Sequence, residues 1–221
     1  MGYDLNFTLI WRHFDKLWSG LILSLELAIL SIGIGCVIGL ALAVLYVSGG
    51  RITRAIIAAY VEVIRNVPLI LLVYLVFYGL PTVVDFAYSN TTSFVVTLSA
   101  YAGAYLVEVF RAGLDAVPKG LIDAGKAIGL TPWQRLLHVR LPTMFRVSLP
   151  SLSNTFVSLF KDTSVASVIA VPELAYAAQW INFNTFRIVE VYAVVTPIYL
   201  VTGYTILFLL RRLERRYAVR T

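Results

Sequence analysis

Apolar residues dominate five long stretches of this sequence, and shorter polar segments separate them. The apolar stretches cover residues 20–47, 56–80, 94–112, 147–170 and 190–210. Each is close to the roughly 20 residues that a helix needs to cross the hydrocarbon core of a membrane. The pattern therefore predicts an all-α transmembrane protein with five spans, which form one domain over residues 20–212.

Composition and charge agree with a membrane protein. Of the 221 residues, 59% are hydrophobic and 14% are charged. The net charge is +6, but the basic residues lie between and after the apolar stretches and not on a polar domain with interleaved aromatic residues. We therefore expect a lipid bilayer as a partner and no nucleic acid. Cys36 is the single cysteine and both histidines stand alone, so we predict neither an internal disulfide nor a metal site.

The positions of Lys and Arg predict the orientation of the spans. The connections rich in these residues are 48–54 and 111–146. The alternate connections, 81–93 and 170–189, hold one such residue between them. Because positive residues accumulate on the cytoplasmic side of a membrane, we expect the N-terminus outside and the C-terminus inside. The expected ends are an extracytoplasmic segment at 1–19 and a basic cytoplasmic tail at 213–221.

The fourth apolar stretch is too polar to face lipid all round. At helical spacing Ser151, Asn154, Ser158 and one of the adjacent charges Lys161 and Asp162 fall on one side. A charged side chain near the bilayer centre costs about 2.5–3.5 kcal/mol on insertion scales, so such residues usually face a bundle interior or a wet cavity. We expect this side to line a polar path. The two charges could equally serve structure, and because they point about 100° apart at most one faces the path squarely.

Two further patterns predict how the spans pack. Gly33, Gly35 and Gly39 form a small-residue stripe in the first stretch, on which another helix can pack closely. Oppositely charged residues also recur three positions apart near the predicted inner ends of the second and third spans. These pairs are Glu62 with Arg65 and Glu108 with Arg111. Each pair is expected to neutralise itself.

The long connection 111–146 is predicted to contain two short helices. Pro118 suits the first helical position, and Gly129 suits a left-handed cap at the end. Between them, the apolar side consists of Leu121, Ala124 and Ile128. A nearby run from Gly120 to Ala127 almost matches a phosphate-binding loop, but Ala127 replaces the hydroxyl that would hold magnesium and no strand comes before it. We therefore expect no nucleotide at this run.

The second short helix follows at once. Thr131 is a predicted N-cap, Pro132 sits at the first helical position, and Gln134 has the spacing of a capping box. Leu141 and Pro142 are expected to end this helix. The alternative interpretation of the connection is an amphipathic hairpin that is merely solvated, although such a hairpin has little need of this capping.

Here the sequence resembles a known family. Its cytoplasmic connection is similar to the EAA signature of ABC importer permeases, which runs E-A-A, three residues, G, nine residues, and I-x-L-P. The matching positions are Asp123, Ala124, Gly125, Gly129, Val139, Leu141 and Pro142. Asp123, Gly125 and Val139 depart mildly from the signature, and Asp123 has a shorter reach than the glutamate of the family. Similarity to the histidine, glutamine, arginine and glutamate/aspartate permeases extends to 62–69, 104–113 and 160–164.

The resemblance implies a type I (MetI-like) permease fold and a role in the import of a polar amino acid across a bacterial inner membrane. It implies a coupling-helix region over 115–142 that docks on a cytoplasmic ATPase dimer. The expected coupling residues are Asp123, Ala124, Gly125, Gly129 and Leu130. The expected residues of the substrate pathway are Ser99, Tyr101, Tyr105, Asn154, Ser158, Lys161, Asp162, Thr163 and Ser164.

The resemblance also implies the partners and the energy source. A second permease subunit, identical or related, would complete the pathway, and a periplasmic solute-binding protein would deliver the cargo. ATP and magnesium would bind to the ATPase, so this chain is expected to be no enzyme and to hold no cofactor. One rival interpretation is an ion-coupled secondary transporter, against which the lack of an internal repeat argues. A second rival is a membrane scaffold, which would have no reason to carry buried charge.

Overall fold

The computed structural model describes residues 4–84 and 88–217, which fold into helices without strands. The first half contains α1 (Thr8–Trp11), α2 (Phe14–Ser48), α3 (Arg51–Asn66), α4 (Leu69–Tyr74), the π turn η1 (Leu75–Gly79), α5 (Leu80–Val84) and α6 (Asn90–Asp115). The second half contains α7 (Lys119–Ala127), α8 (Pro132–Arg135), the π turn η2 (Leu136–Arg140), α9 (Leu141–Asp162), the 3₁₀ segment η3 (Thr163–Ile169), α10 (Leu174–Thr185) and α11 (Ile188–Tyr217).

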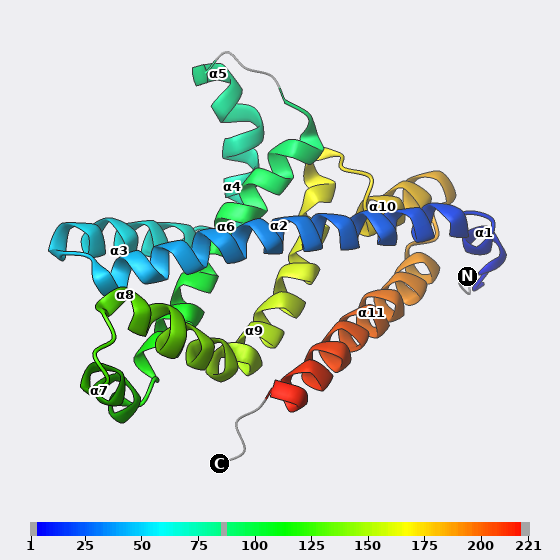
Figure 1. The fold of residues 1–221 in the computed structure, drawn as a ribbon. Coiled ribbons are helices and arrows are strands. Elements are labelled where there is room, and N and C mark those ends of the chain that lie inside the picture. Colours follow the sequence, from blue (N-terminus) through cyan, green and yellow to red (C-terminus); the bar gives the residue numbers. More distant parts are fainter. Residues whose placement is uncertain (1–3, 85–87, 218–221) are drawn as a thin grey trace.

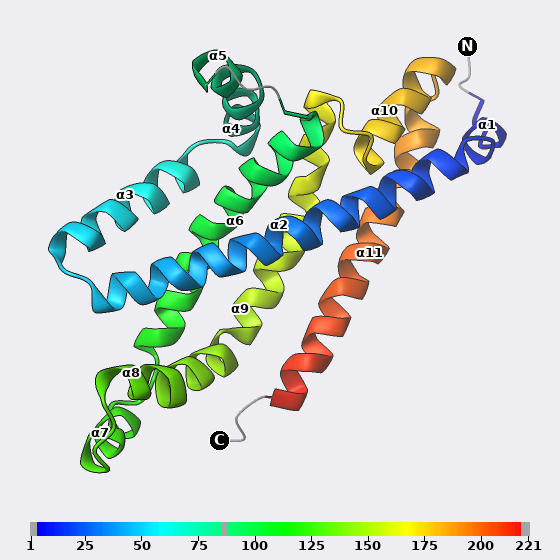
Figure 2. The same ribbon diagram turned by 45° about the horizontal axis from the view of Figure 1, so that its top comes forward.

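The helices form a bundle with two distinct ends (Figures 1 and 2). The short helices α7 and α8 gather at one end with the C-terminal end of α11, while α1, α5 and α10 lie at the opposite end. The long helix α2 crosses both α6 and α9. The predicted coupling region and residues 213–217 of the predicted basic tail therefore share one end of the molecule, while residues 218–221 of that tail lie outside the described residues.

The predicted number of membrane spans agrees with the described helices. Three of them, α2, α6 and α11, are each long and apolar enough to cross a membrane. Two bent pairs bring the number to five if each pair is one span. The first pair joins α3 to the segment Leu69–Val83 with a bend of 105°, and the second joins Pro132–Ile169 to α10 with a bend of 46°.

The bend in the second span is a departure from the unbroken helix that the apolar run 56–80 predicts. Helix α3 ends at Asn66, and Val67 takes an extended conformation before Pro68. The proline ring disfavours a helical conformation at the residue before it, and Pro68 has no N–H with which to continue the ladder. In the last turn of α3 the side chain of Asn66 folds back and donates a hydrogen bond over 2.7 Å to the carbonyl of Glu62.

The prediction that Leu141 and Pro142 end the second short helix is wrong. Helical structure continues from Pro132 through η2 and α9 to Asp162. The π turn η2 ends at Arg140, two positions before Pro142, which occupies the first turn of α9. Because a π turn already shifts the hydrogen-bond ladder, the missing N–H of Pro142 is accommodated without ending the helix.

The core is centred on α6, against which α2 packs closely. A Cβ atom added at Gly35 would lie 2.6 Å from the Cβ of Ala102, and one at Gly39 would lie 2.7 Å from the Cβ of Leu106. These two glycines therefore form the predicted small-residue stripe. Gly33 does not belong to it, because a Cβ there would meet nothing within 4 Å. The close contact fixes the position of α6, which carries one wall of the site described next.

Candidate functional site

A polar cavity of about 340 Å³ lies between α6 and α9. Its walls consist of Tyr101, Tyr105, Asn154, Thr155, Ser158, Leu159 and Asp162. Four-residue spacing, as in Tyr101 with Tyr105 and Ser158 with Asp162, places such side chains on one face of a helix. The structure thus brings together five of the predicted pathway residues. Thr155 and Leu159 were missed, although their own four-residue spacing beside the polar stripe could have indicated them.

The cavity offers hydroxyl, amide and carboxylate groups. The hydroxyl of Tyr101 donates a hydrogen bond over 3.1 Å to the hydroxyl of Tyr105. Asp162 is partly buried and takes part in none of the ion pairs formed among residues 4–84 and 88–217. Because a carboxylate removed from water needs a positive partner, Asp162 can accept an ammonium group of a cargo molecule.

Lys161 faces a different groove from Asp162. It lines a cavity of about 200 Å³ between α9 and α11, together with residues such as Val157, Tyr199 and Gly203. The rotation of about 100° between neighbouring helix positions separates the two charges. This arrangement resolves which of the pair lies with the tyrosines: it is Asp162.

Three further residues predicted for the pathway do not line the cavity between α6 and α9. Ser99 is only 3% exposed and lies on another side of α6. The hydroxyl of Thr163 donates to the carbonyl of Phe160 over 2.7 Å inside the protein. The carbonyl of Ser164 accepts from the hydroxyl of Ser167 over 2.8 Å. For Thr163 and Ser164 the reason is the change to a 3₁₀ helix after Asp162, which ends the register of the α9 stripe.

Charged residues surround a third cavity of about 180 Å³ between α2, α3 and α6. Here Glu108 forms the predicted pair with Arg111, at 2.8 Å. The predicted pair of Glu62 with Arg65 does not form. Instead, the guanidinium of Arg65 lies 5.0 Å from the ring centre of Tyr105, because the break after α3 leaves Arg65 in the last turn of that helix, beside α6. Tyr105 therefore separates this charged cavity from the one that holds Asp162.

The end of α7 has the cap that the sequence predicts. Gly129 has φ +81°, a conformation that glycine adopts without steric cost. The amide of Leu130 donates a hydrogen bond to the carbonyl of Gly125 over 2.9 Å. The amide of Gly129 donates to the carbonyl of Lys126, also over 2.9 Å. This pair of bonds is the Schellman motif. The capping box of Thr131 and Gln134 follows it directly, with both hydrogen bonds present.

The apolar side of α7 faces away from the rest of the chain. Leu121 is 46% exposed and Ile128 is 76% exposed, and Ala124 is exposed as well. Gly125 is buried against Arg135, and Asp123 forms an exposed ion pair with Lys126 at 2.8 Å. The run from Gly120 to Ala127 is helical, so its amides do not form a phosphate-binding loop. A rigid, capped helix thus presents an apolar surface with no partner in the described chain.

Comparison with known proteins gives consistent matches over almost the full chain. Residues 35–219 match the family of binding-protein-dependent transport system inner membrane components. The glutamine transport system permease protein GlnP of Escherichia coli is 34% identical over 215 residues, which cover 97% of this chain and 98% of GlnP.

Two solved structures have the same fold. A crystal structure of an amino acid ABC transporter with histidines contains a chain that is 31% identical, with a TM-score of 0.89, and covers 97% of this chain and 100% of that one. A chain of the methionine transporter MetNI has a TM-score of 0.78 at 22% sequence identity. The match covers 92% of this chain and 97% of the MetNI chain. This chain therefore belongs to the family of binding-protein-dependent transport system inner membrane components, the membrane-embedded permease subunits of ABC importers.

Proposed function

We propose that this chain carries a polar amino acid across a bacterial inner membrane as the permease subunit of an ATP-driven importer, with Asp162 holding the α-ammonium group of the cargo. The observation that carries the proposal is the cavity between α6 and α9, in which one carboxylate without an ion pair lies opposite two tyrosines. An α-ammonium is common to all amino acids, so the cavity suits the class. Two similar proteins support the same class: GlnP is named for glutamine transport, and the solved amino acid ABC transporter is described with histidines.

Membership of the family implies two kinds of partner, an ATPase and a solute-binding protein. We place the ATPase, which binds ATP and magnesium, on the exposed apolar side of α7. A helix this short gains stability from burying such a side against a partner. Asp123, Ala124, Gly125, Gly129 and Leu130 form or shape this helix and its cap. Two ATPase subunits would dock on two permease subunits, because five spans alone seldom enclose a path.

The orientation follows from the same proposal. The end with α7, α8 and the basic end of α11 faces the cytoplasm, and the end with α5 and α10 faces the periplasm, where the binding protein releases its cargo. The break between α3 and α4 and the one between η3 and α10 lie in the two bent spans. Non-helical backbone at membrane depth is tolerated where protein or a wet cavity surrounds it.

The proposed cycle is alternating access. Closure of the ATPase subunits on ATP would move α7 as a rigid body, and α6 and α9, to which it is connected, would move with it. The cavity that they enclose would then open toward the periplasm and, after hydrolysis, toward the cytoplasm. The permease needs no covalent step of its own, since the cargo must only bind unequally to the two states.

The experiment is uptake of labelled glutamine, histidine, arginine, glutamate and aspartate by proteoliposomes that contain this chain with its ATPase and binding protein. Asp162→Asn removes the charge in the cavity, and Lys161→Gln is the matched change of the neighbouring charge in the other groove. A charge-assisted hydrogen bond is worth about 1.5–3 kcal/mol, so Asp162→Asn should reduce uptake at least about tenfold. Lys161→Gln should stay close to wild type.

Two outcomes would contradict the proposal. If Lys161→Gln abolishes uptake while Asp162→Asn is neutral, the cargo passes along the other groove. If uptake persists without ATP and follows a proton or sodium gradient, the protein is an ion-coupled secondary transporter.

A further inference from the structure

A second groove lies on a different side of α9 from the cavity between α6 and α9, here called the cargo cavity, and it runs along α11 into a cluster of arginines. Its upper part is the cavity of about 200 Å³ that includes Val157 and Gly203. Its lower part has a volume of about 400 Å³ and is lined by Tyr204, Leu207, Phe208, Arg211, Arg212 and Arg215. Tyr204 and Leu207 line both parts, so the two cavities form one continuous groove, here called the α11 groove.

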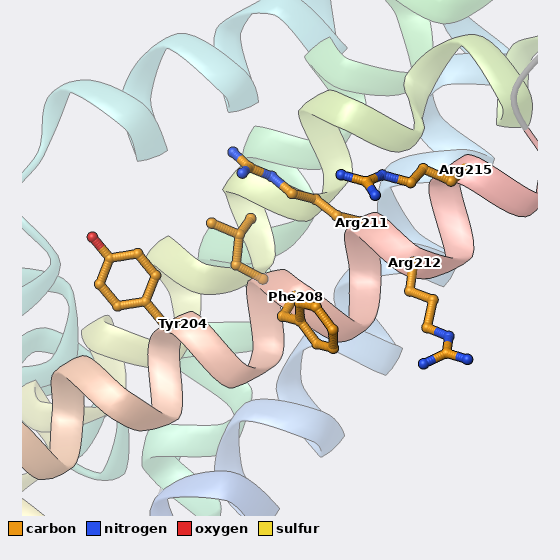
Figure 3. A pocket seen from close by; sticks show the side chains of 6 residues that line it. Tyr204, Phe208, Arg211, Arg212 and Arg215 are labelled. Atoms are coloured by element: carbon orange, nitrogen blue, oxygen red, sulfur yellow. The ribbon is translucent and has the colours of Figure 1, made fainter.

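Apart from Lys161, whose exposed side chain borders the upper part, the α11 groove is lined by apolar and aromatic residues along α11, and it is positively charged at its lower end. Leu200, Tyr204 and Phe208 are 57%, 65% and 64% exposed, and α11 is the least buried of the three unbroken spans α2, α6 and α11. Figure 3 shows that Arg211 and Arg215 extend to one side of α11, whereas Arg212 extends to the other. Two guanidinium groups one turn apart can bind the oxygens of a single phosphate.

The charges at the lower end have no acidic partner in the described structure. None of the ion pairs among residues 4–84 and 88–217 includes Arg211, Arg212 or Arg215. Glu214 lies on the same turn of α11 but forms no ion pair with them there. Placing several unpaired cations together costs free energy through mutual repulsion, which an anion would remove.

The length of the groove matches one leaflet of a bilayer. From Arg211 to Leu200 the helix rises about 16 Å, at 1.5 Å per residue. Half of a hydrocarbon core of about 30 Å is about 15 Å. A phospholipid whose phosphate lies at Arg211 would therefore reach Leu200 with the ends of its acyl chains. Gly203 leaves room beside them, because a Cβ there would meet only Val157, at 3.8 Å.

We propose that the α11 groove binds an anionic phospholipid, with its phosphate between Arg211 and Arg215 and an acyl chain along Leu207, Gly203 and Leu200. The occupant is a lipid of the leaflet on the basic side, and the proposal rests on the membrane orientation given above but not on the nature of the cargo. A second copy of this chain suits the groove less well. In a two-fold symmetric contact through this face, the two arginine clusters would oppose one another.

The test uses the complete transporter complex, purified from nanodiscs that contain phosphatidylcholine and phosphatidylglycerol in equal amounts. Native mass spectrometry counts the phosphatidylglycerol molecules that each complex retains. The double variant Arg211→Gln/Arg215→Gln removes the phosphate site. The control Arg51→Gln/Arg146→Gln removes the same charge from exposed positions elsewhere. Gly203→Leu fills the groove and leaves every charge in place.

We expect wild type and the control to retain phosphatidylglycerol in preference to phosphatidylcholine. Retention should fall at least tenfold in Arg211→Gln/Arg215→Gln and severalfold in Gly203→Leu, and excess inorganic phosphate should not displace the lipid. Equal retention by all variants, or equal loss from the control, would overturn the proposal. So would displacement by phosphate together with a neutral Gly203→Leu, since the site would then bind only an anion. A disulfide between Tyr204→Cys residues of two copies would show that protein covers the groove.

Discussion

The hydroxyl of Ser24 in α2 donates a hydrogen bond over 3.2 Å to the carboxylate of Glu173, 149 positions further along the chain. The same carboxylate accepts hydrogen bonds from the amides of Ala175 and Tyr176 and from the hydroxyl of Tyr199. Glu173 is fully buried. One side chain therefore caps α10 and ties it to α2 and α11, at the end that we propose to be periplasmic.

Removal of this carboxylate should destabilise the protein. Glu173→Ala leaves the amides of Ala175 and Tyr176 and the hydroxyl of Tyr199 without this acceptor, and each unsatisfied buried group costs about 1–3 kcal/mol. We expect a loss of about 3 kcal/mol or more in the free energy of unfolding, measured as a lower thermal midpoint in detergent. Glu26→Ala, at an exposed position of α2, is the control. An unchanged midpoint for Glu173→Ala would show that the network contributes nothing to stability.

Alanine at the glycines of α2 should have opposite effects at neighbouring positions. Gly35→Ala and Gly39→Ala would force α2 away from α6, because the new Cβ atoms would lie under 3.0 Å from Ala102 and Leu106. Such overpacking costs about 1–3 kcal/mol. Gly33→Ala meets open space and should be neutral or stabilising, since alanine favours a helix by roughly 0.5–1 kcal/mol. Thermal unfolding of the three variants checks the order, and equal effects at all three positions would refute the packing described here.

The tyrosines of the cargo cavity should contribute unequally to transport. Tyr101→Phe removes one hydroxyl but keeps the ring, and the expected loss of about 0.5–1.5 kcal/mol lowers uptake by roughly two- to tenfold. Tyr105→Leu also removes the ring beneath Arg65, worth a further 0.5–1 kcal/mol or so, and should reduce uptake more. The measurement is the uptake rate at saturating loaded binding protein. If Tyr105→Leu transports faster than Tyr101→Phe, the ring contact with Arg65 is not used.

Local chemistry explains which parts of the structure the sequence predicts well. The cap at Gly129 and the capping box of Thr131 depend on neighbouring residues, and both are as expected. The break at Pro68 was also readable, since proline restricts the residue before it, but the unbroken apolar run concealed it. The prediction that the helix ends at Pro142 was wrong because the π turn before this proline cannot be predicted from residue types.

Long-range contacts explain the parts that the sequence could not predict. Glu173 gives no sign in the sequence that Ser24 and Tyr199 will surround it. Lys161 and Asp162 are adjacent, and only the packing of α6 on one side of α9 and of α11 on the other assigns them to different grooves. The small-residue stripe was predicted, but only the position of α6 shows that Gly35 and Gly39 belong to the contact and that Gly33 does not.

We propose that ATP drives import through the capped helix α7. The most direct measurement is ATP-dependent amino acid uptake by the reconstituted complex with Gly129→Asp. The left-handed conformation and the added charge should disrupt the turn beside the exposed apolar side. Gly120→Asp, at an open position near the start of α7, is the matched control. We predict that uptake requires ATP, is lost in Gly129→Asp and persists in Gly120→Asp, with equal amounts of permease in the membrane. Uptake that is indifferent to both ATP and Gly129 would contradict the account.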